Sequence, residues 1–189
     1  MLLKRGIEMG SIKLSDAFVA ETIANIKPHW GTLGWVTYKR TYARWNDAAG
    51  RTEEWHETVK RVIEGNINLD PRLQEGTASV ADIDALQIEA EELFRAIYSL
   101  SATPSGRNLW ISGTPYQEAH GDALNNCWFV AMRPQAYGES HIVLPYADKQ
   151  EIMASMPFAF LFDQLMKGGG VGVSVTQKNV AQMPAVAQT

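Results

Sequence analysis

The sequence contains one cysteine, Cys127, among 189 residues. A single cysteine cannot close a disulfide within the chain, which argues against the small secreted domains that depend on disulfides for stability. Low cysteine usage fits a reducing compartment, and we therefore expect a cytoplasmic protein.

Two further absences limit the kind of partner. The formal net charge is −4, whereas nucleic-acid binders usually carry a clustered basic excess. The N-terminus shows no apolar stretch with a cleavage site, so no signal peptide is predicted. The longest apolar run near the C-terminus is interrupted by Asp163 and is too short to cross a bilayer. We expect neither nucleic acid nor a membrane as a partner.

Sequence patterns for metal and phosphate binding are also missing. The four histidines are scattered, with no spacing typical of a metal site, so we expect no metal ligands. The glycine run 168–170 lacks the Gly-Lys-Ser/Thr of a phosphate-binding loop, and it follows a predicted helix rather than a first strand. Two interpretations of this run stay open: a helix C-cap with a tight turn, or backbone N–H groups offered to a ligand.

The first hundred residues have the periodicity of helices, over residues 14–28, 34–45, 52–67 and 79–100. Ser79 and Asp82 resemble a capping box at the start of the last of these. The predicted buried positions are Trp55, Val59, Val62 and Ile63, then Ile83, Leu86, Ala90, Leu93, Phe94 and Ile97. Acidic side chains on helix faces are expected to be solvated: Glu53, Glu54, Glu57, Glu89, Glu91 and Glu92. Residues 68–77 are predicted to be a loop.

The composition changes near Ser101, where Gly, Pro, Ser, Thr and Asn become frequent. Residues 108–112 suggest a short strand, and the apolar run 127–132 predicts a strand buried on both faces, as in parallel sheets. Residues 137–150 are an expected exposed connection. A buried helix over 155–167, with Pro157 in its first turn, then leads through the glycine run into a strand. The fold class is therefore α/β.

Cys127 stands at the head of the apolar run, directly behind Asn125 and Asn126. A free cysteine is most often a small residue packed in a core. The asparagines and the preceding loop would instead suit a redox group at the mouth of a site. A Cys–His hydrolase, with His120 or His141 as base, has no supporting local motif. The residues alone leave the packed and the redox interpretations open.

Three long segments together resemble a known family: residues 26–45, 103–134 and 156–175. They are similar to the N-terminal part of adenosylcobalamin-dependent (class II) ribonucleotide reductases, of the monomeric type that reduces ribonucleoside triphosphates. The resemblance implies an N-terminal helical region, residues 1–100, followed by the start of the reductase barrel, residues 101–189. That barrel is a ten-stranded α/β barrel in the family, and only its first strands would lie in this chain.

The resemblance also implies roles for particular residues. Cys127 matches the first cysteine of a redox-active pair, whose second cysteine lies much later in the family's sequences. The expected substrate-binding residues are Ser105, Arg107, Asn108, Asn126, Gly169 and Gly170. Arg107 and Asn108 stand where the family more often has Pro-Thr, which leaves the phosphate contacts open. No metal ligand is implied in this chain.

Cofactor and partners follow from the same resemblance. Adenosylcobalamin would generate a thiyl radical that removes the ribose 3′ hydrogen, with its contacts mainly outside this chain. The implied partners are a ribonucleoside triphosphate, a deoxynucleotide effector, a thioredoxin-like reductant and a second chain carrying the rest of the barrel. We expect the segment alone to be inactive, because the partner of Cys127 is not among these residues. The alternatives are a noncatalytic nucleotide-binding module and a fragment of a class I or class III reductase.

Overall fold

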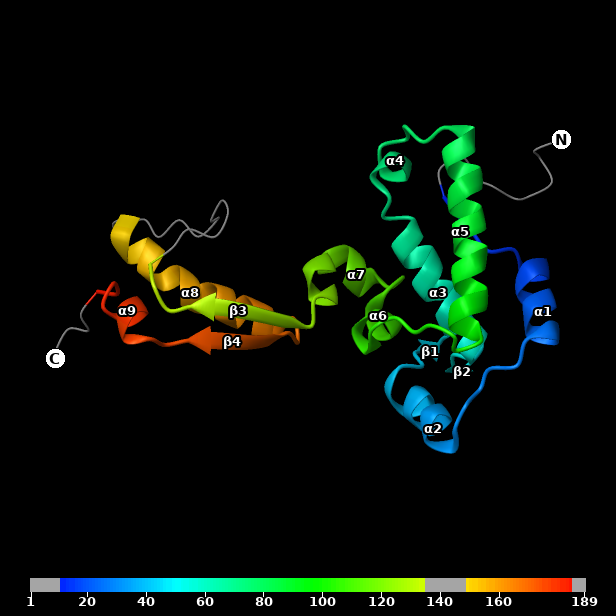
Figure 1. Cartoon of the computed structure of the whole chain (residues 1–189), viewed down its shortest axis with the longest axis horizontal. Helices are drawn as coiled ribbons and strands as arrows, with labels where there is room; N and C mark the ends of the chain where they lie inside the picture. Colours follow the sequence, from blue (N-terminus) through cyan, green and yellow to red (C-terminus); the bar gives the residue numbers. More distant parts are fainter. Residues whose placement is uncertain (1–10, 135–148, 185–189) are drawn as a thin grey trace. The chain divides into compact units, whose positions relative to one another are not determined.

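The computed structural model describes residues 11–134 and 149–184 (Figure 1). Contacts between residues divide the chain into two compact units, Met1–Leu124 (unit 1) and Asn125–Thr189 (unit 2). None of the helices in the described ranges has the length and apolar character that crossing a bilayer requires.

Unit 1 is built from helices, as the periodicity of its sequence predicts. Its elements are α1 (Asp16–Asn25), α2 (Thr32–Thr41), β1 (Trp45–Asn46), β2 (Arg51–Thr52), α3 (Trp55–Ile67), α4 (Pro71–Gln74), α5 (Val80–Tyr98), α6 (Gly106–Ile111), α7 (Pro115–Ala119) and the 3₁₀ helix η2 (Gly121–Leu124). β1 and β2 pair antiparallel. Helices form in all four predicted segments, but the one predicted over 34–45 ends at Thr41, and Trp45 belongs to β1. The loop predicted over 68–77 is wrong in part, because Asp70 accepts a hydrogen bond from the Arg72 N–H and starts α4 at Pro71.

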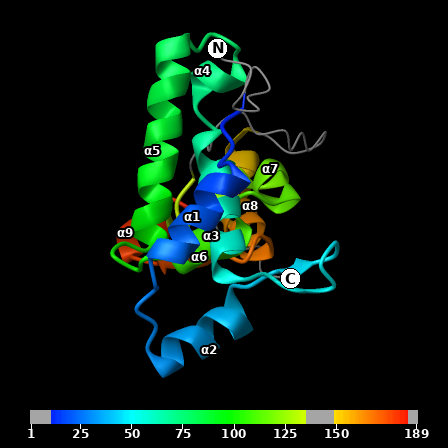
Figure 2. The same cartoon turned by 90° about the vertical axis from the view of Figure 1, so that its right-hand side faces the viewer.

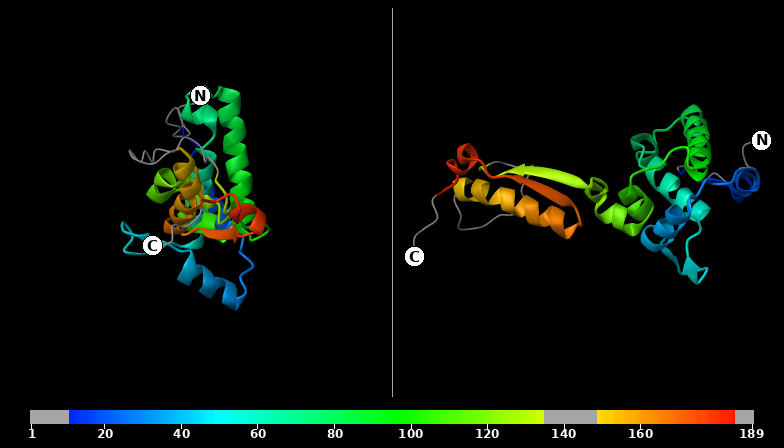
Figure 3. Two further views of the ribbon diagram at one scale, coloured as in Figure 1. Left: turned by 90° about the vertical axis from the view of Figure 1, so that its left-hand side faces the viewer. Right: turned by 60° about the horizontal axis from the view of Figure 1, so that its bottom comes forward.

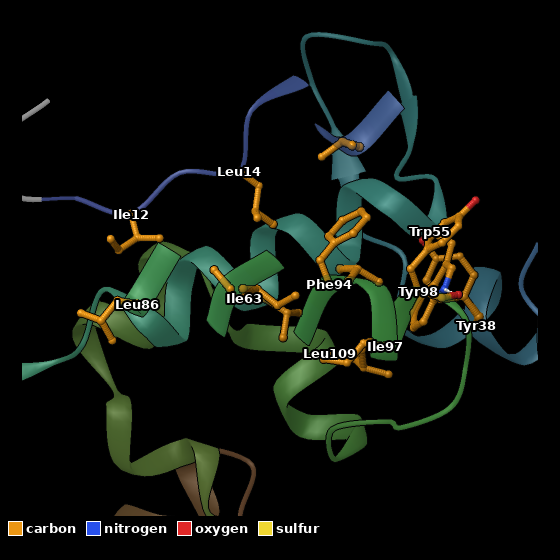
Figure 4. Packing of buried hydrophobic residues seen from close by; sticks show 14 of the residues in the cluster. Ile12, Leu14, Tyr38, Trp55, Ile63, Leu86, Phe94, Ile97, Tyr98 and Leu109 are labelled. Carbon is orange, nitrogen blue, oxygen red and sulfur yellow. Dashed lines mark hydrogen bonds between the residues drawn. The ribbon is translucent and has the colours of Figure 1, made fainter. Parts of the chain in front are cut away.

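The core of unit 1 forms where α3 and α5 run side by side (Figures 1 and 2). The predicted capping box of α5 is present: Ser79 Oγ accepts from the Asp82 N–H, and the Asp82 carboxylate accepts from the Ser79 N–H. Figure 4 shows the aromatic end of this core, where Trp55 Nε1 donates to the Tyr98 carbonyl at 3.0 Å. Leu93 was predicted to be buried, but it is 40% exposed because it lies at the edge of the buried stripe.

Residues 108–112 are not a strand, which corrects the sequence prediction. They belong mostly to α6, whose N-cap Ser105 accepts a hydrogen bond from the Asn108 N–H. Leu109 and Ile111 are buried, and Trp110 between them is exposed. That burial order imitates the alternation of a strand over three residues, which is too short a stretch to separate a helix from a strand.

Unit 2 contains β3 (Cys127–Ala131), α8 (Lys149–Met166), β4 (Gly170–Ser174) and α9 (Gln177–Val180). The two strands are parallel, as predicted, and Cys127 pairs in register with Gly170. Helix α8 lies along one face of the strand pair (Figure 3, right). The rings of Trp128 and Phe160 meet edge to face there, with centroids 5.6 Å apart.

Two predictions for unit 2 are wrong. β3 is not buried on both faces within the described residues, since Phe129 is 70% exposed and α8 covers only one face. Pro157 is not in the first turn of its helix: α8 begins at Lys149, and Pro157 is a buried interior residue. Most of the connection predicted over 137–150 lies outside the described residues, and its last two residues open α8.

The two units divide between Leu124 and Asn125, whereas the composition changes near Ser101. The residues in between belong to unit 1 because α6 packs on α3. The limits of the reductase regions, 1–100 and 101–189, stay a prediction.

Candidate functional site

The predicted substrate segment of unit 1 begins as a capped turn. Ser105 Oγ accepts hydrogen bonds from the Asn108 backbone N–H at 3.3 Å and from Asn108 Nδ2 at 3.0 Å. The Asn108 side-chain oxygen accepts from Ser112 Oγ at 2.9 Å and lies 3.4 Å from Asn66 Nδ2. Arg107 lies between Ser105 and Asn108, at the second position of α6, and is half-buried. The segment is thus held in one conformation by side chains of α3 and α6.

Two arginines hold the other end of α6. Arg61 donates to the carbonyl of Ser112 at 2.5 Å and to that of Leu109 at 3.0 Å. Arg44 donates to the Trp110 carbonyl at 2.8 Å, and its guanidinium lies 5.9 Å from the centre of the Trp110 ring. The last carbonyls of a helix have no partner within the helix, and cations stabilise that negative end of its dipole.

Arg61 is in turn held by Glu53, which is only 7% exposed. The Arg61 Nε and Nη2 atoms lie 2.6 and 2.8 Å from the two carboxylate oxygens of Glu53. Glu53 Oε2 also accepts from Thr58 Oγ1 at 2.8 Å and from the Arg44 N–H at 3.1 Å. Buried carboxylates require such partners. The prediction that Glu53 is solvated is therefore wrong.

The charges around Glu53 set its acidity. Burial alone would raise the pKa of Glu53, but the hydrogen bonds and positive charge of Arg61 outweigh it and lower the pKa below the ordinary 4.5. Glu64 of α3 behaves in the opposite way: burial raises its pKa even though it accepts from the Leu14 N–H. Burial likewise raises the pKa of Tyr38, whose hydroxyl lies 2.8 Å from Thr58 Oγ1.

The pKa shifts of Glu53 and Glu64 predict opposite effects of pH on stability. The lowered pKa of Glu53 stabilises the fold above pH 4.5, and this stabilisation is lost as the pH falls through the folded-state pKa. Glu53→Gln should therefore flatten the loss of unfolding free energy in acid. The raised pKa of Glu64 favours its protonated form in the fold, so the fold loses stability as the pH rises from 4.5 through the folded-state pKa. Glu64→Gln should remove that decline.

Urea unfolding of each variant from about pH 3 to about pH 7, followed by tryptophan fluorescence, measures both effects. The parent chain at each pH is the reference. For each variant, the difference in unfolding free energy from the parent is plotted against pH. Two variants whose differences change with pH in the same direction would contradict this description of the two carboxylates.

The other predicted residues lie in unit 2, where the strand register brings them together. Cys127 is exposed at the start of β3 and pairs with Gly170, the first residue of β4. The Asn126 carbonyl accepts from the Gly170 N–H at 2.8 Å. A reactive thiol has to be accessible, which an exposed strand end provides. The structure therefore disfavours the packed interpretation of Cys127 within unit 2.

The glycine run ends α8 in a Schellman motif. Gly168 has a φ of +75°, its N–H donates to the Leu165 carbonyl at 2.9 Å, and the Gly169 N–H donates to the Gln164 carbonyl at 2.9 Å. The helix C-cap interpretation of the run is thus confirmed. A Cβ at Gly169 would lie 3.0 Å from the Gln164 carbonyl oxygen and 3.3 Å from Trp128 Cδ1. Gly169 thereby allows the turn to pack closely against β3.

The family follows from comparison with known proteins. Residues 14–114 match the model of the ribonucleotide reductase alpha domain, which is more than half of the chain. The chain belongs to the ribonucleotide reductase family.

Individual reductases are similar along nearly the whole chain. The adenosylcobalamin-dependent ribonucleoside-triphosphate reductase of Levilactobacillus brevis is 65% identical over 179 residues, covering 95% of this chain and 24% of that protein. The protein of the same name from Lactobacillus helveticus is 67% identical over 175 residues, covering 93% of this chain and 23% of that protein. A crystal structure of a B12-dependent (class II) ribonucleotide reductase superposes with a TM-score of 0.83 at 62% identity, covering 92% of this chain and 24% of the other. The chain thus spans about a quarter of the length of these relatives.

Within this member of the reductase family, the predicted residues form two local groups. Ser105, Arg107 and Asn108 share one turn of unit 1. Asn126, Cys127, Gly169 and Gly170 adjoin one another at one end of the strand pair in unit 2. Sequence reasoning missed Arg44, Arg61 and the buried state of Glu53. No local pattern marks them, because the contacts of the two arginines with the α6 segment join residues far apart in the sequence.

Proposed function

We propose that the chain is the N-terminal segment of an adenosylcobalamin-dependent ribonucleoside-triphosphate reductase. The complete enzyme would convert ribonucleoside triphosphates to 2′-deoxyribonucleoside triphosphates. The observation that carries the proposal is the match to a class II reductase structure over 92% of this chain, at 62% identity. A noncatalytic nucleotide-binding module, or a fragment of another reductase class, is not favoured by relatives of this similarity.

Cys127 is proposed to be one of the two thiols that reduce the substrate. The ribose C2′–OH bond breaks, the hydroxyl leaves as water, and C2′ gains a hydrogen, while the two thiols lose two electrons and two protons to form a disulfide. A thiyl radical elsewhere in the complete enzyme would remove the 3′ hydrogen and later return it. The exposed position of Cys127 supports this role, and the chain itself offers no second cysteine.

Ser105, Arg107, Asn108, Asn126, Gly169 and Gly170 are proposed to contact the nucleotide. Arg107 suits phosphate because a guanidinium presents paired donors to phosphate oxygens. The N–H groups of Gly169 and Gly170 already donate to protein carbonyls. A role for these two glycines therefore rests on the close approach that the absence of a Cβ allows.

β3 and β4 are proposed to be the first strands of the ten-stranded α/β barrel. Their parallel pairing supports this, because parallel strands are normally covered on both faces. The exposed Phe129 on β3 fits coverage by further parts of the reductase. A deoxynucleotide effector, a thioredoxin-like reductant, a second chain carrying the rest of the barrel and a cytoplasmic location belong to the same proposal.

Adenosylcobalamin, when bound, would supply the radical chemistry of the complete enzyme. The part of the chain that the structure describes has no grouping of three or more His, Cys, Asp or Glu side chains able to hold a metal ion. We propose that the contacts of the cofactor lie mainly in the remainder of the reductase.

A chimaera tests the proposed function. In it, this chain replaces the matching quarter of the Levilactobacillus brevis reductase, to which it is 65% identical. We expect the chimaera to form deoxynucleotide only with adenosylcobalamin, at a rate within about tenfold of the parent enzyme. The 189-residue chain alone should form none. A folded chimaera that binds nucleoside triphosphate without reducing it would contradict the proposal and favour the noncatalytic module.

A further inference from the structure

We propose that Arg61 is a positioning residue: held by Glu53, it fixes the C-terminal end of α6 and so orients the segment 105–108 toward the substrate. The inference rests on the proposed function, since that segment is a substrate segment only in a reductase. Arg61 itself has no proposed contact with the nucleotide.

The first argument is that α6 cannot hold itself. It has six residues, and helices this short are not stable in water without tertiary contacts. Its terminal carbonyls are bound from outside the helix. Leu109 and Ser112 accept from Arg61, and Trp110 accepts from Arg44. The C-terminal end of α6 is therefore held by the two arginines, together with the burial of Leu109 and Ile111.

The second argument is the geometry of the Arg61 guanidinium. One edge forms the two-bond contact with the Glu53 carboxylate at 2.6 and 2.8 Å, and the remaining N–H groups reach two carbonyls of α6. The Arg61 side chain is only 14% exposed, so little water competes for these donors. A lysine has one nitrogen and cannot present the same planar set of donors.

The third argument links this end of α6 to the substrate segment. Ser112, whose carbonyl Arg61 holds, donates from Oγ to the Asn108 side chain at 2.9 Å. Asn108 in turn donates to Ser105 Oγ at 3.0 Å. A short series of hydrogen bonds thus runs from Arg61 to Asn108 and Ser105, the two residues that flank the Gly106–Arg107 pair. Loosening Arg61 should displace the segment while leaving its residues chemically intact.

The test uses the active chimaera with Arg61→Lys and Arg61→Met. Arg72→Met is the matched control, because Arg72 forms its ion pairs with Asp70 and Asp82 rather than with α6. At a temperature where all variants are folded, we expect both Arg61 variants to raise KM for the ribonucleoside triphosphate about tenfold, with kcat within about threefold of the parent. The control should keep the parent values.

Hydrogen exchange of the same variants supplies a second readout. We expect Arg61→Lys to lose amide protection in residues 106–113, with α3 and α5 unchanged. A folded Arg61→Lys variant with parental KM and parental protection would overturn the proposal. Loss of protection across all of unit 1 would also overturn it, because that result shows a general structural role. If the chimaera is inactive, the proposed function fails, and exchange in α6 still decides whether Arg61 holds the helix.

Discussion

Cys127→Ser is expected to abolish ribonucleotide reduction by the chimaera, lowering turnover by roughly 10³-fold or more, as is found when one member of a concerted catalytic set is removed. A serine hydroxyl fills nearly the same volume as a thiol but cannot give up electrons to form a disulfide. Cys127 is exposed at the start of β3, so the substitution removes no buried contact. Steady-state deoxynucleotide formation with a dithiol reductant is the measurement.

The control for this variant is a change of similar size on the same strand pair. Val173→Thr alters a partly exposed residue of β4 that has no proposed role, and it should leave turnover within about threefold of the parent. Both variants should bind nucleotide and melt as the parent does. A Cys127→Ser chimaera with near-parental turnover would show that Cys127 is not one of the reducing thiols.

Gly113→Ala is expected to destabilise unit 1 by about 3 kcal/mol, because strain and overlap act together. Gly113 has a φ of +70°, in the left-handed region that side chains with a Cβ rarely adopt. A Cβ there would also overlap the Arg61 carbonyl oxygen and lie 2.7 Å from Arg61 Cγ. Because α3 approaches this turn through Gly65, the backbone has no room to retreat.

Gly76→Ala separates the two causes. Gly76 has nearly the same φ, +67°, but nothing lies within 4 Å of a Cβ placed on it. This variant should lose only about 1 kcal/mol, the cost of the backbone strain. Urea unfolding of both variants gives the difference. Equal losses would mean that the overlap of a Cβ at Gly113 with Arg61 adds nothing to the cost of the backbone strain.

The helices of unit 1 could be predicted because their signals are local. Ser79 and Asp82 sit at the spacing of a capping box, and Val59, Val62 and Ile63 repeat at the helical period; all of them behave as the sequence predicts. Short elements could not be predicted in the same way. In α4 and α6 the capping side chains of Asp70 and Ser105 decide the structure, and the apolar pattern over so few residues fits several conformations.

The candidate site was predictable only in part. The apolar run 127–132 predicted a strand of a parallel sheet, but the register of β3 with β4, which places Cys127 beside Gly170, was found only in the structure. The buried pair of Glu53 and Arg61 was not predictable, because both residue types are normally solvated and the contacts of Arg61 with α6 span many residues of sequence. Burial of a charge depends on partners that only the folded chain brings together.

The most direct test of the central claim is the oxidation state of Cys127 after one turnover. The reduced chimaera is mixed with adenosylcobalamin and ribonucleoside triphosphate without a dithiol reductant, and is then alkylated and analysed by mass spectrometry. We predict one deoxynucleotide per enzyme together with loss of alkylation at Cys127, which joins a cysteine of the remaining sequence in a disulfide. If deoxynucleotide forms and Cys127 is afterwards still fully alkylated, so that its thiol was not oxidised, its role as a reducing thiol is contradicted.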